Sequence, residues 1–141
     1  TAAMFDACLY FNTAALARRL ERLWAEAFAP FDLTPPQAFM LRALLREPGL
    51  LQGQLAKGMA ISRPTATRAL DGLAAKGLVT RSPSAADGRE TVLHPTPEAE
   101  RLRAALDEAS GLVTAQLRAV LSDATFDTTV GQIRSVRQAL D

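Results

Sequence analysis

Residues 61–96, ISRPTATRALDGLAAKGLVTRSPSAADGRETVLHPT, carry the clearest structural signals in this chain. Ser62 is a typical helix N-cap, and the apolar side chains after it recur at helical spacing as far as Lys76. Gly77 stands where a left-handed residue is expected to end a helix. Asp87-Gly88 is a turn signal between two short runs of strand character. The stretch therefore predicts a helix followed by a β-hairpin.

The residues upstream predict two longer helices. We expect the first over residues 4–29, where apolar side chains recur at spacings of three, four and seven, and Pro30 ends it. The second begins at Thr34, which forms a capping box with Gln37, and stops at Pro48-Gly49.

A shorter element lies between these helices and the opening stretch. Leu50-Leu51 is a short strand or turn, and a short helix follows around residues 52–59. Gly53 and Gly58 weaken this helix, because glycine is a poor helix former. Two helices joined by a tight turn and followed by a hairpin form a winged helix-turn-helix. We therefore expect a mainly α fold with a small β-hairpin wing.

The C-terminal third predicts two further helices. Thr96 is an N-cap with Pro97 at the first helical position, and apolar side chains recur beyond them at helical spacing. Ser122-Asp123 breaks this helix and caps the last one. Long helices with apolar stripes thus flank the small middle block.

Composition excludes several classes of protein. The 141 residues are 48% hydrophobic and hold one Cys and one His, which is too few for a disulfide or a typical zinc site. No Ser-His-Asp set or phosphate-binding glycine loop is present, so we expect neither an enzyme nor a cofactor. No apolar run approaches the ~20 residues needed to cross a bilayer, and the first residues lack a signal-peptide pattern. We expect a cytoplasmic protein with no membrane partner.

The charge distribution points to a polyanion. Net charge is only +1, but residues 51–90 carry six basic and three acidic side chains. Residues 91–141 carry five basic and seven acidic ones. A basic surface on an otherwise neutral body is typical of nucleic-acid binding.

Residues 61–96 contain side chains of the kind that contact double-stranded DNA. A recognition helix presents its N-terminal residues to base edges in the major groove, where hydroxyl and guanidinium groups read bases or hold phosphates. Arg89 at the hairpin tip is placed for a neighbouring minor groove, and Asp87 is expected to orient it by a charge-assisted hydrogen bond. The candidate DNA contacts are Ser62, Arg63, Pro64, Thr65, Thr67, Arg68, Arg81, Ser84, Asp87 and Arg89.

Each of these residues also has an ordinary structural interpretation. An exposed arginine is commonly just a solvated charge, and Ser62 serves as a helix cap in either case. A winged helix that binds only protein is therefore the alternative to DNA binding. His94, beside the wing, fits a structural or dimer-facing role, although histidine titrates near neutral pH.

The order of elements resembles the MarR family of bacterial transcription regulators. The resemblance rests on LTPPQAFMLRAL (33–44), LAKGMAISRPTATRALDGLAAKGLVTR (55–81) and DGRE (87–90) before a helix that starts at a Thr. Where many members have a Gly a few residues after that Thr, this chain has TPEAE.

The resemblance implies a homodimeric transcriptional repressor whose two DNA-binding domains straddle a pseudo-palindromic operator. Residues 1–33 and 96–141 would form the dimerisation helices around a DNA-binding domain in residues 34–95. The apolar stripes of the terminal helices agree, because one chain alone would leave them exposed. A monomeric helical bundle is the alternative.

The resemblance also implies a pocket for a small aromatic or phenolic effector between the terminal helices and the winged domain. Many relatives release DNA when such a compound binds. The candidate lining combines apolar side chains with arginines that would meet an anion: Trp24, Phe28, Phe39, Met40, Arg22, Arg18 and Arg19. Aromatic side chains also fit an ordinary hydrophobic core.

Cys8 lies in FDACLYFN, residues 5–12. Some MarR relatives that sense organic peroxides carry a reactive Cys near this place, and Tyr side chains help to bind its thiolate. This chain has one tyrosine, Tyr10, and the nearby Asp6 disfavours a thiolate. Cys8 is therefore either a peroxide-sensing thiol or a small hydrophobe in a dimer-packing face.

Overall fold

The computed structural model describes residues 4–141, so the first three residues of the predicted N-terminal segment 1–33 lie outside it. Its elements in chain order are α1 (Leu9–Phe28), the 3-10 turn η1 (Ala29–Phe31), α2 (Pro35–Arg46), α3 (Gln52–Gly58), α4 (Arg63–Ala75), β1 (Val79–Pro83), β2 (Thr91–Pro95), α5 (Pro97–Leu121) and α6 (Asp123–Leu140). The mainly α architecture with a two-stranded wing confirms the predicted fold class.

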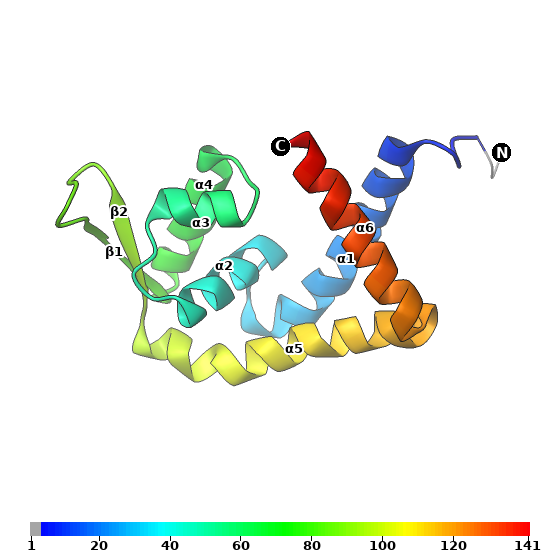
Figure 1. The fold of residues 1–141 in the computed structure, drawn as a ribbon. Coiled ribbons are helices and arrows are strands. Elements are labelled where there is room, and N and C mark those ends of the chain that lie inside the picture. Colours follow the sequence, from blue (N-terminus) through cyan, green and yellow to red (C-terminus); the bar gives the residue numbers. More distant parts are fainter. Residues whose placement is uncertain (1–3) are drawn as a thin grey trace.

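Helix α5 runs along one side of the molecule and joins its two ends (Figure 1). At one end lie α3, α4 and the β1–β2 hairpin, and at the other lie α6 and the beginning of α1. Helix α2 lies between them and contacts α1, α4, α5 and β2. The fold therefore has a wing-bearing lobe and a helical lobe that share α2 and α5.

The predicted start of the first helix is wrong by five residues. Residues 4–7 form a turn, and Cys8 is an extended N-cap whose sulfur accepts a hydrogen bond from the Phe11 amide at 3.5 Å. The Asn12 side chain donates to the carbonyls of Asp6 and Cys8, at 2.7 and 2.9 Å. These local bonds compete with helix formation, and the apolar spacing alone does not reveal them.

The other predicted helix signals are confirmed. Thr34 and Gln37 form a reciprocal capping box, and the hydroxyls of Ser62 and Thr96 cap α4 and α5. Gly77, just after α4, has a φ of +71°. These caps fix where α2, α4 and α5 begin, and with them the faces that each helix buries.

The core lies where α2, α4, α5 and the hairpin meet. Leu41 and Leu44 of α2, Leu70 of α4, Leu93 of β2 and Leu106 of α5 are all fully buried. Burying each such side chain stabilises the fold by about 1.5–3 kcal/mol. Helix α4 is thus held by its apolar face, which leaves its opposite face free.

Glycine 72 allows α4 to lie close to α2. A side-chain carbon at Gly72 would clash with the Gln37 amide nitrogen. Lys76, at the C-terminal end of α4, bonds the Asp32 carbonyl and lies 3.6 Å from its carboxylate. The C-terminal half of α4 is therefore fixed against α2 and the turn before it.

The wing is a regular antiparallel hairpin. Val79 pairs with Pro95 and Pro83 with Thr91, and the Ser84 amide donates to the Glu90 carbonyl at 2.8 Å across the loop. The predicted strand or turn at Leu50-Leu51 contributes one isolated bridge, between Leu51 and Val92. The hairpin is thereby joined to the segment just before α3.

The corner between α5 and α6 is held by Arg118. Its guanidinium donates to Asp127 at 2.9 Å and to Asp123 at 3.1 Å, and it lies 4.3 Å from the centre of the Phe126 ring. Mainly through the Asp127 bond and then the Asp123 bond, the pKa of Arg118 is raised above its ordinary value. Ser122, with a φ of +71°, makes the turn itself.

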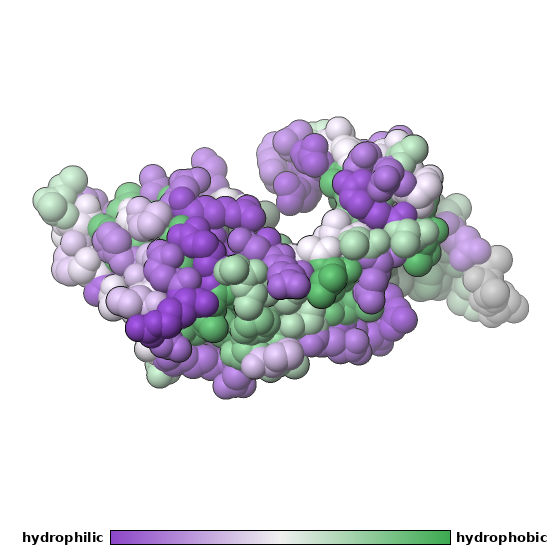
Figure 2. Space-filling view, turned by 90° about the horizontal axis from the view of Figure 1, so that it is seen from below, coloured by the Kyte–Doolittle hydropathy of each residue, from purple (hydrophilic) through white to green (hydrophobic). Residues whose placement is uncertain are grey.

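Many apolar side chains remain exposed at the helical lobe. In Figure 2, seen from the α5 side, hydrophobic surface crosses the middle of the molecule and continues onto this lobe. The exposed large apolar residues of α1, α5 and α6 include Leu9, Tyr10, Phe11, Leu16, Leu112, Val120, Val130, Ile133, Val136 and Leu140. Within residues 4–141, no helix is long and apolar enough to span a membrane.

Candidate nucleic-acid interface

The N-terminal half of α4 has an exposed face. Ala66 and Leu70 are buried, whereas Arg63, Thr67 and Arg68 are exposed. Ser62 and Pro64 are exposed beside them, and Thr65 is half-buried. The Ser62 hydroxyl accepts from the Thr65 amide at 3.3 Å and lies 2.9 Å from the Thr65 hydroxyl. Thr65 is thus part of the helix cap.

The Thr67 hydroxyl is held by two partners. It donates to the Arg63 carbonyl at 3.0 Å and accepts from the Gln52 side-chain amide at 3.0 Å. The hydroxyl proton is therefore already used, and the Thr67 methyl group stays available for contact. Gln52 is missing from the sequence-based predictions; its only signal was a polar side chain at the first position of the short helix.

Arg81 connects the wing to α4. Its guanidinium donates to the Asp71 carboxylate at 2.6 Å. Because one arm of the guanidinium is held by this ion pair, Arg81 positions the hairpin relative to α4. Its predicted contact with DNA stays a prediction.

The loop of the wing is shaped by side chains that bond its backbone. The Ser84 hydroxyl accepts from the amides of Ala86 and Asp87 at 3.3 and 3.4 Å. The Asp87 carboxylate accepts from the Arg89 amide at 3.0 Å. The expected side-chain bond between Asp87 and Arg89 is wrong, because a carboxylate two residues before an amide closes an Asx turn. The Arg89 guanidinium is exposed, with no ion pair among residues 4–141.

A polar hollow of about 180 Å³ lies between α3, α4 and the wing. It brings together Arg63 of α4 and Arg89 of the wing loop, beside the carboxylate of Glu90. Its full lining is Gln52, Gly53, Ala56, Arg63, Thr67, Arg89, Glu90 and Thr91. Arg68 lies outside this lining, farther along α4.

The predicted effector residues separate into two groups. Phe28 and Met40 are fully buried core residues, so their predicted place in a pocket lining is wrong. Trp24 and Phe39 instead line an open groove of about 470 Å³, with Ala17, Leu20, Glu21, Pro35, Pro36, Met59 and Ile61. Arg22, Arg18 and Arg19 are exposed on α1 and are not part of this lining.

Arg42 is the arginine that adjoins this groove. It lies 5.1 Å from the centre of the Phe39 ring and donates to Asp107 at 2.8 Å and to Ser110 at 3.1 Å. The Trp24 indole N–H donates to the same Ser110 hydroxyl at 3.1 Å. Because these partners are far apart in sequence, periodicity gave no sign of the network.

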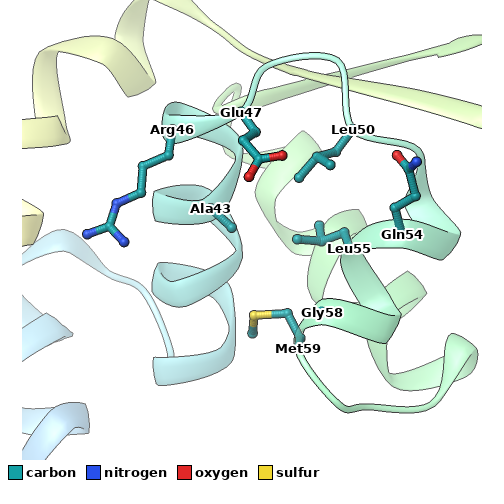
Figure 3. A pocket seen from close by; sticks show the side chains of 8 residues that line it. All are labelled: Ala43, Arg46, Glu47, Leu50, Gln54, Leu55, Gly58 and Met59. Carbon is teal, nitrogen blue, oxygen red and sulfur yellow. The ribbon is translucent and has the colours of Figure 1, made fainter.

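A second hollow, of about 350 Å³, lies between α2 and α3 (Figure 3). Leu50, Leu55 and Met59 point into it, whereas the side chain of Arg46 extends away from it. The floor is apolar and continuous with the core through the buried Leu55.

His94 lies in β2 opposite Thr80 and is exposed. Its ring lies near Gly49, where an added side-chain carbon would be 3.6 Å from the His94 Nε2. Within residues 4–141, no group of three His, Cys, Asp or Glu side chains is placed to hold a metal ion.

The two helices, the tight turn between them and the hairpin define a winged helix-turn-helix protein with long helical arms. Residues 31–90 match the MarR family.

Relatives and solved structures agree with this match. A putative transcriptional regulatory protein for the hcr operon of Thauera aromatica is 32% identical over 102 residues, covering 72% of this chain and 61% of that protein. An uncharacterized HTH-type regulator of Bacillus subtilis is 29% identical, over 62% of this chain and 58% of its own length. The matches thus span about three fifths of the curated relatives.

Solved structures match over nearly the whole chain. A MepR–DNA complex from S. aureus has a TM-score of 0.85 at 21% identity, covering 93% of this chain and 96% of that one. The PcaV regulator of Streptomyces coelicolor, solved with its natural ligand, has a TM-score of 0.78 at 27% identity. That match covers 89% of this chain and 92% of PcaV.

Cys8 provides a first test at the helical lobe. The thiol is exposed, and within residues 4–141 its sulfur has one hydrogen bond, from the Phe11 amide. Because no cationic side chain is bonded to it, we expect stoichiometric cumene hydroperoxide to leave Cys8 alkylatable, as mass spectrometry after iodoacetamide treatment would report. A Cys8→Ser variant controls for background labelling. Rapid loss of alkylation would contradict this expectation and support peroxide sensing.

Proposed function

We propose that the protein is a sequence-specific DNA-binding transcription regulator that acts as a homodimer on a pseudo-palindromic operator. The observation that carries this proposal is the polar hollow in which Arg63 of the recognition helix meets Arg89 of the wing. Two elements that approach DNA from different directions thus present arginines on one face.

The geometry suggests how each element would act. The exposed N-terminal face of α4 fits a major groove, where Arg63 and Arg68 would read bases or hold phosphates. The unpaired Arg89 would enter the adjacent minor groove. The names of the Thauera relative and of the MepR–DNA complex support this interpretation. Such a protein would act in the cytoplasm. Because many regulators of this type repress transcription, we propose that it is a repressor.

The exposed apolar faces support the homodimer. A groove of about 580 Å³ between α1 and α6 is lined by Leu9, Tyr10, Ile133, Val136 and Leu140, together with Thr13, Thr129, Gln132 and Arg137. Contiguous apolar surface of this kind marks a protein interface. Helices of a second copy would cover it and set the distance between the two wings.

A small aromatic effector is the third part of the proposal. The groove beside Trp24 and Phe39 is apolar, and Arg42 adjoins it through the Phe39 ring. PcaV, a structurally similar protein, was solved in complex with its natural ligand. A ligand that binds only the DNA-incompetent state lowers DNA affinity by linkage.

Two alternatives lead to different measurements. A winged helix that binds only protein would lack the steep salt dependence that phosphate contacts produce. A thiol-based peroxide sensor of the same family would lose DNA affinity on oxidation of Cys8.

DNA binding is tested with fragments selected from genomic DNA. We expect half-sites about 10 bp apart and a log affinity that falls linearly with log salt concentration. Arg63→Ala or Arg68→Ala should cost about 1–3 kcal/mol at the base pair that the residue reads, whereas Arg89→Ala should weaken binding more evenly. Arg19→Ala, which removes an exposed charge on α1, is the matched control. Equal affinity for selected and random DNA at low salt would refute the proposal.

The dimer is tested by placing a charge in the α1–α6 groove. Ile133→Asp or Val136→Asp should halve the mass measured by sedimentation velocity, from two chains to one, because the interface would then bury a carboxylate in place of an apolar side chain. Both side chains are about two-fifths exposed in one chain, so folding should persist, as circular dichroism would show. Ala85→Asp on the wing loop should remain dimeric. A wild-type protein that sediments as one chain would overturn this part of the proposal.

The effector groove is tested with a panel of aromatic carboxylates. We expect at least one to quench Trp24 fluorescence and to release the protein from selected DNA, since Trp24 lines the groove. Phe39→Ala should weaken that binding by removing one wall of the groove, while Arg22→Ala, outside the lining, should not. If no compound changes either the fluorescence or the DNA affinity, the groove is not an effector site of this class.

A further inference from the structure

Gly53 lies in the first turn of α3, directly against the Arg63 guanidinium. A side-chain carbon at Gly53 would be 3.3 Å from Arg63 Nη2 and 3.9 Å from Arg63 Cζ. It would also be 3.8 Å from Glu90 Oε2, on the side of the wing. A side chain at residue 53 would therefore have to push the guanidinium aside by a few tenths of an ångström.

The backbone gives no reason for a glycine at this position. Gly53 is in a helix, and the glycines with positive φ in residues 4–141 are Gly49 and Gly77. Glycine inside a helix costs stability relative to alanine. Gly58, in the same helix, has nothing within 4 Å of an added side-chain carbon. What distinguishes Gly53 is its contact with Arg63.

The backbone of Arg63 is fixed by a separate interaction. Its carbonyl accepts from the Thr67 hydroxyl, which in turn accepts from the Gln52 amide. Gln52 and Gly53 are adjacent in α3, so one turn of α3 holds the α4 start by a hydrogen bond and leaves room for its arginine. Residues of α3 thus lie against both the start of α4 and the side chain of Arg63.

We propose that Gly53 is a specificity-determining residue of the DNA-binding face, because its missing side chain sets the direction in which Arg63 meets DNA. The inference rests on the proposed function. A guanidinium is a rigid planar fork, and its bidentate contact with a base edge depends on orientation. A displacement of the Arg63 guanidinium by a few tenths of an ångström would therefore change recognition at the base pair that it contacts.

Gly53→Ala separates this role from a role in folding. The atom that must move is the end of a flexible side chain, so the fold accommodates the new methyl group. We expect the melting temperature to rise by roughly 2–4 °C, because alanine favours the helix. We expect affinity for the selected operator to fall about tenfold, with the loss concentrated at the base pair that Arg63 contacts.

The experiment compares Gly53→Ala, the control Gly58→Ala, Arg63→Ala and the double variant Gly53→Ala/Arg63→Ala. Affinities are measured at low salt against the operator and a panel with each base pair replaced in turn. Gly58→Ala should keep the wild-type affinity and base preferences. In the Arg63→Ala background, Gly53→Ala should have less than about a twofold effect, because the group it displaces is gone.

The possible failures can be told apart. If wild-type protein prefers selected DNA and Gly53→Ala matches it at every base pair, only the inference about Gly53 is overturned. The same holds if Gly53→Ala loses equal affinity with and without Arg63. If the wild-type protein shows no preference for selected DNA, the proposed function itself fails, and this inference fails with it.

Discussion

The burial of α2 is the constraint on which the rest of the structure depends. Its side chains Leu41 and Leu44 are fully enclosed, and the helix contacts α1, α4, α5 and β2. Helix α5 is the other element that contacts both lobes, through α1, α6 and β2. Because α4 is held through this core, its outward face does not have to pack against other elements and can carry polar side chains.

A polar seam beside that core links the lobes by a second route. Arg42 of α2 bonds Asp107 and Ser110 of α5, and Ser110 also accepts from Trp24 of α1. The Arg42 side chain is only 14% exposed, so losing a partner would leave a poorly solvated charge. This seam borders the groove at Phe39, which places the proposed effector site on the junction between the two lobes.

Local signals in the sequence predicted the fold well, whereas contacts between residues far apart in the chain could not be predicted from it. The caps at Thr34, Ser62 and Thr96 depend on neighbours three residues away, so the chain itself displays them. The start of α1 was predicted too early because the bonds from the Asn12 side chain to the Asp6 and Cys8 carbonyls leave no trace in the apolar spacing. Phe28 and Met40 were placed in a pocket because composition cannot separate a core aromatic or Met from a lining one. The roles of Arg81 and Gly53 depend on partners in other elements, which no periodicity reveals.

For the proposed DNA-binding face, the positions of the arginine side chains matter more for recognition than the total charge does. Of its arginines, Arg81 is paired with Asp71, and the Glu90 carboxylate lies in the same hollow as Arg63 and Arg89. Salt screens the long-range attraction of such a surface within about 8–10 Å. Under the proposed function, discrimination between base pairs would depend on the directions in which its exposed arginines point. The Thr67–Gln52 bond, the Asx turn at Asp87 and the open space at Gly53 all act on those directions, so three small features of the chain together determine how its few arginines are presented.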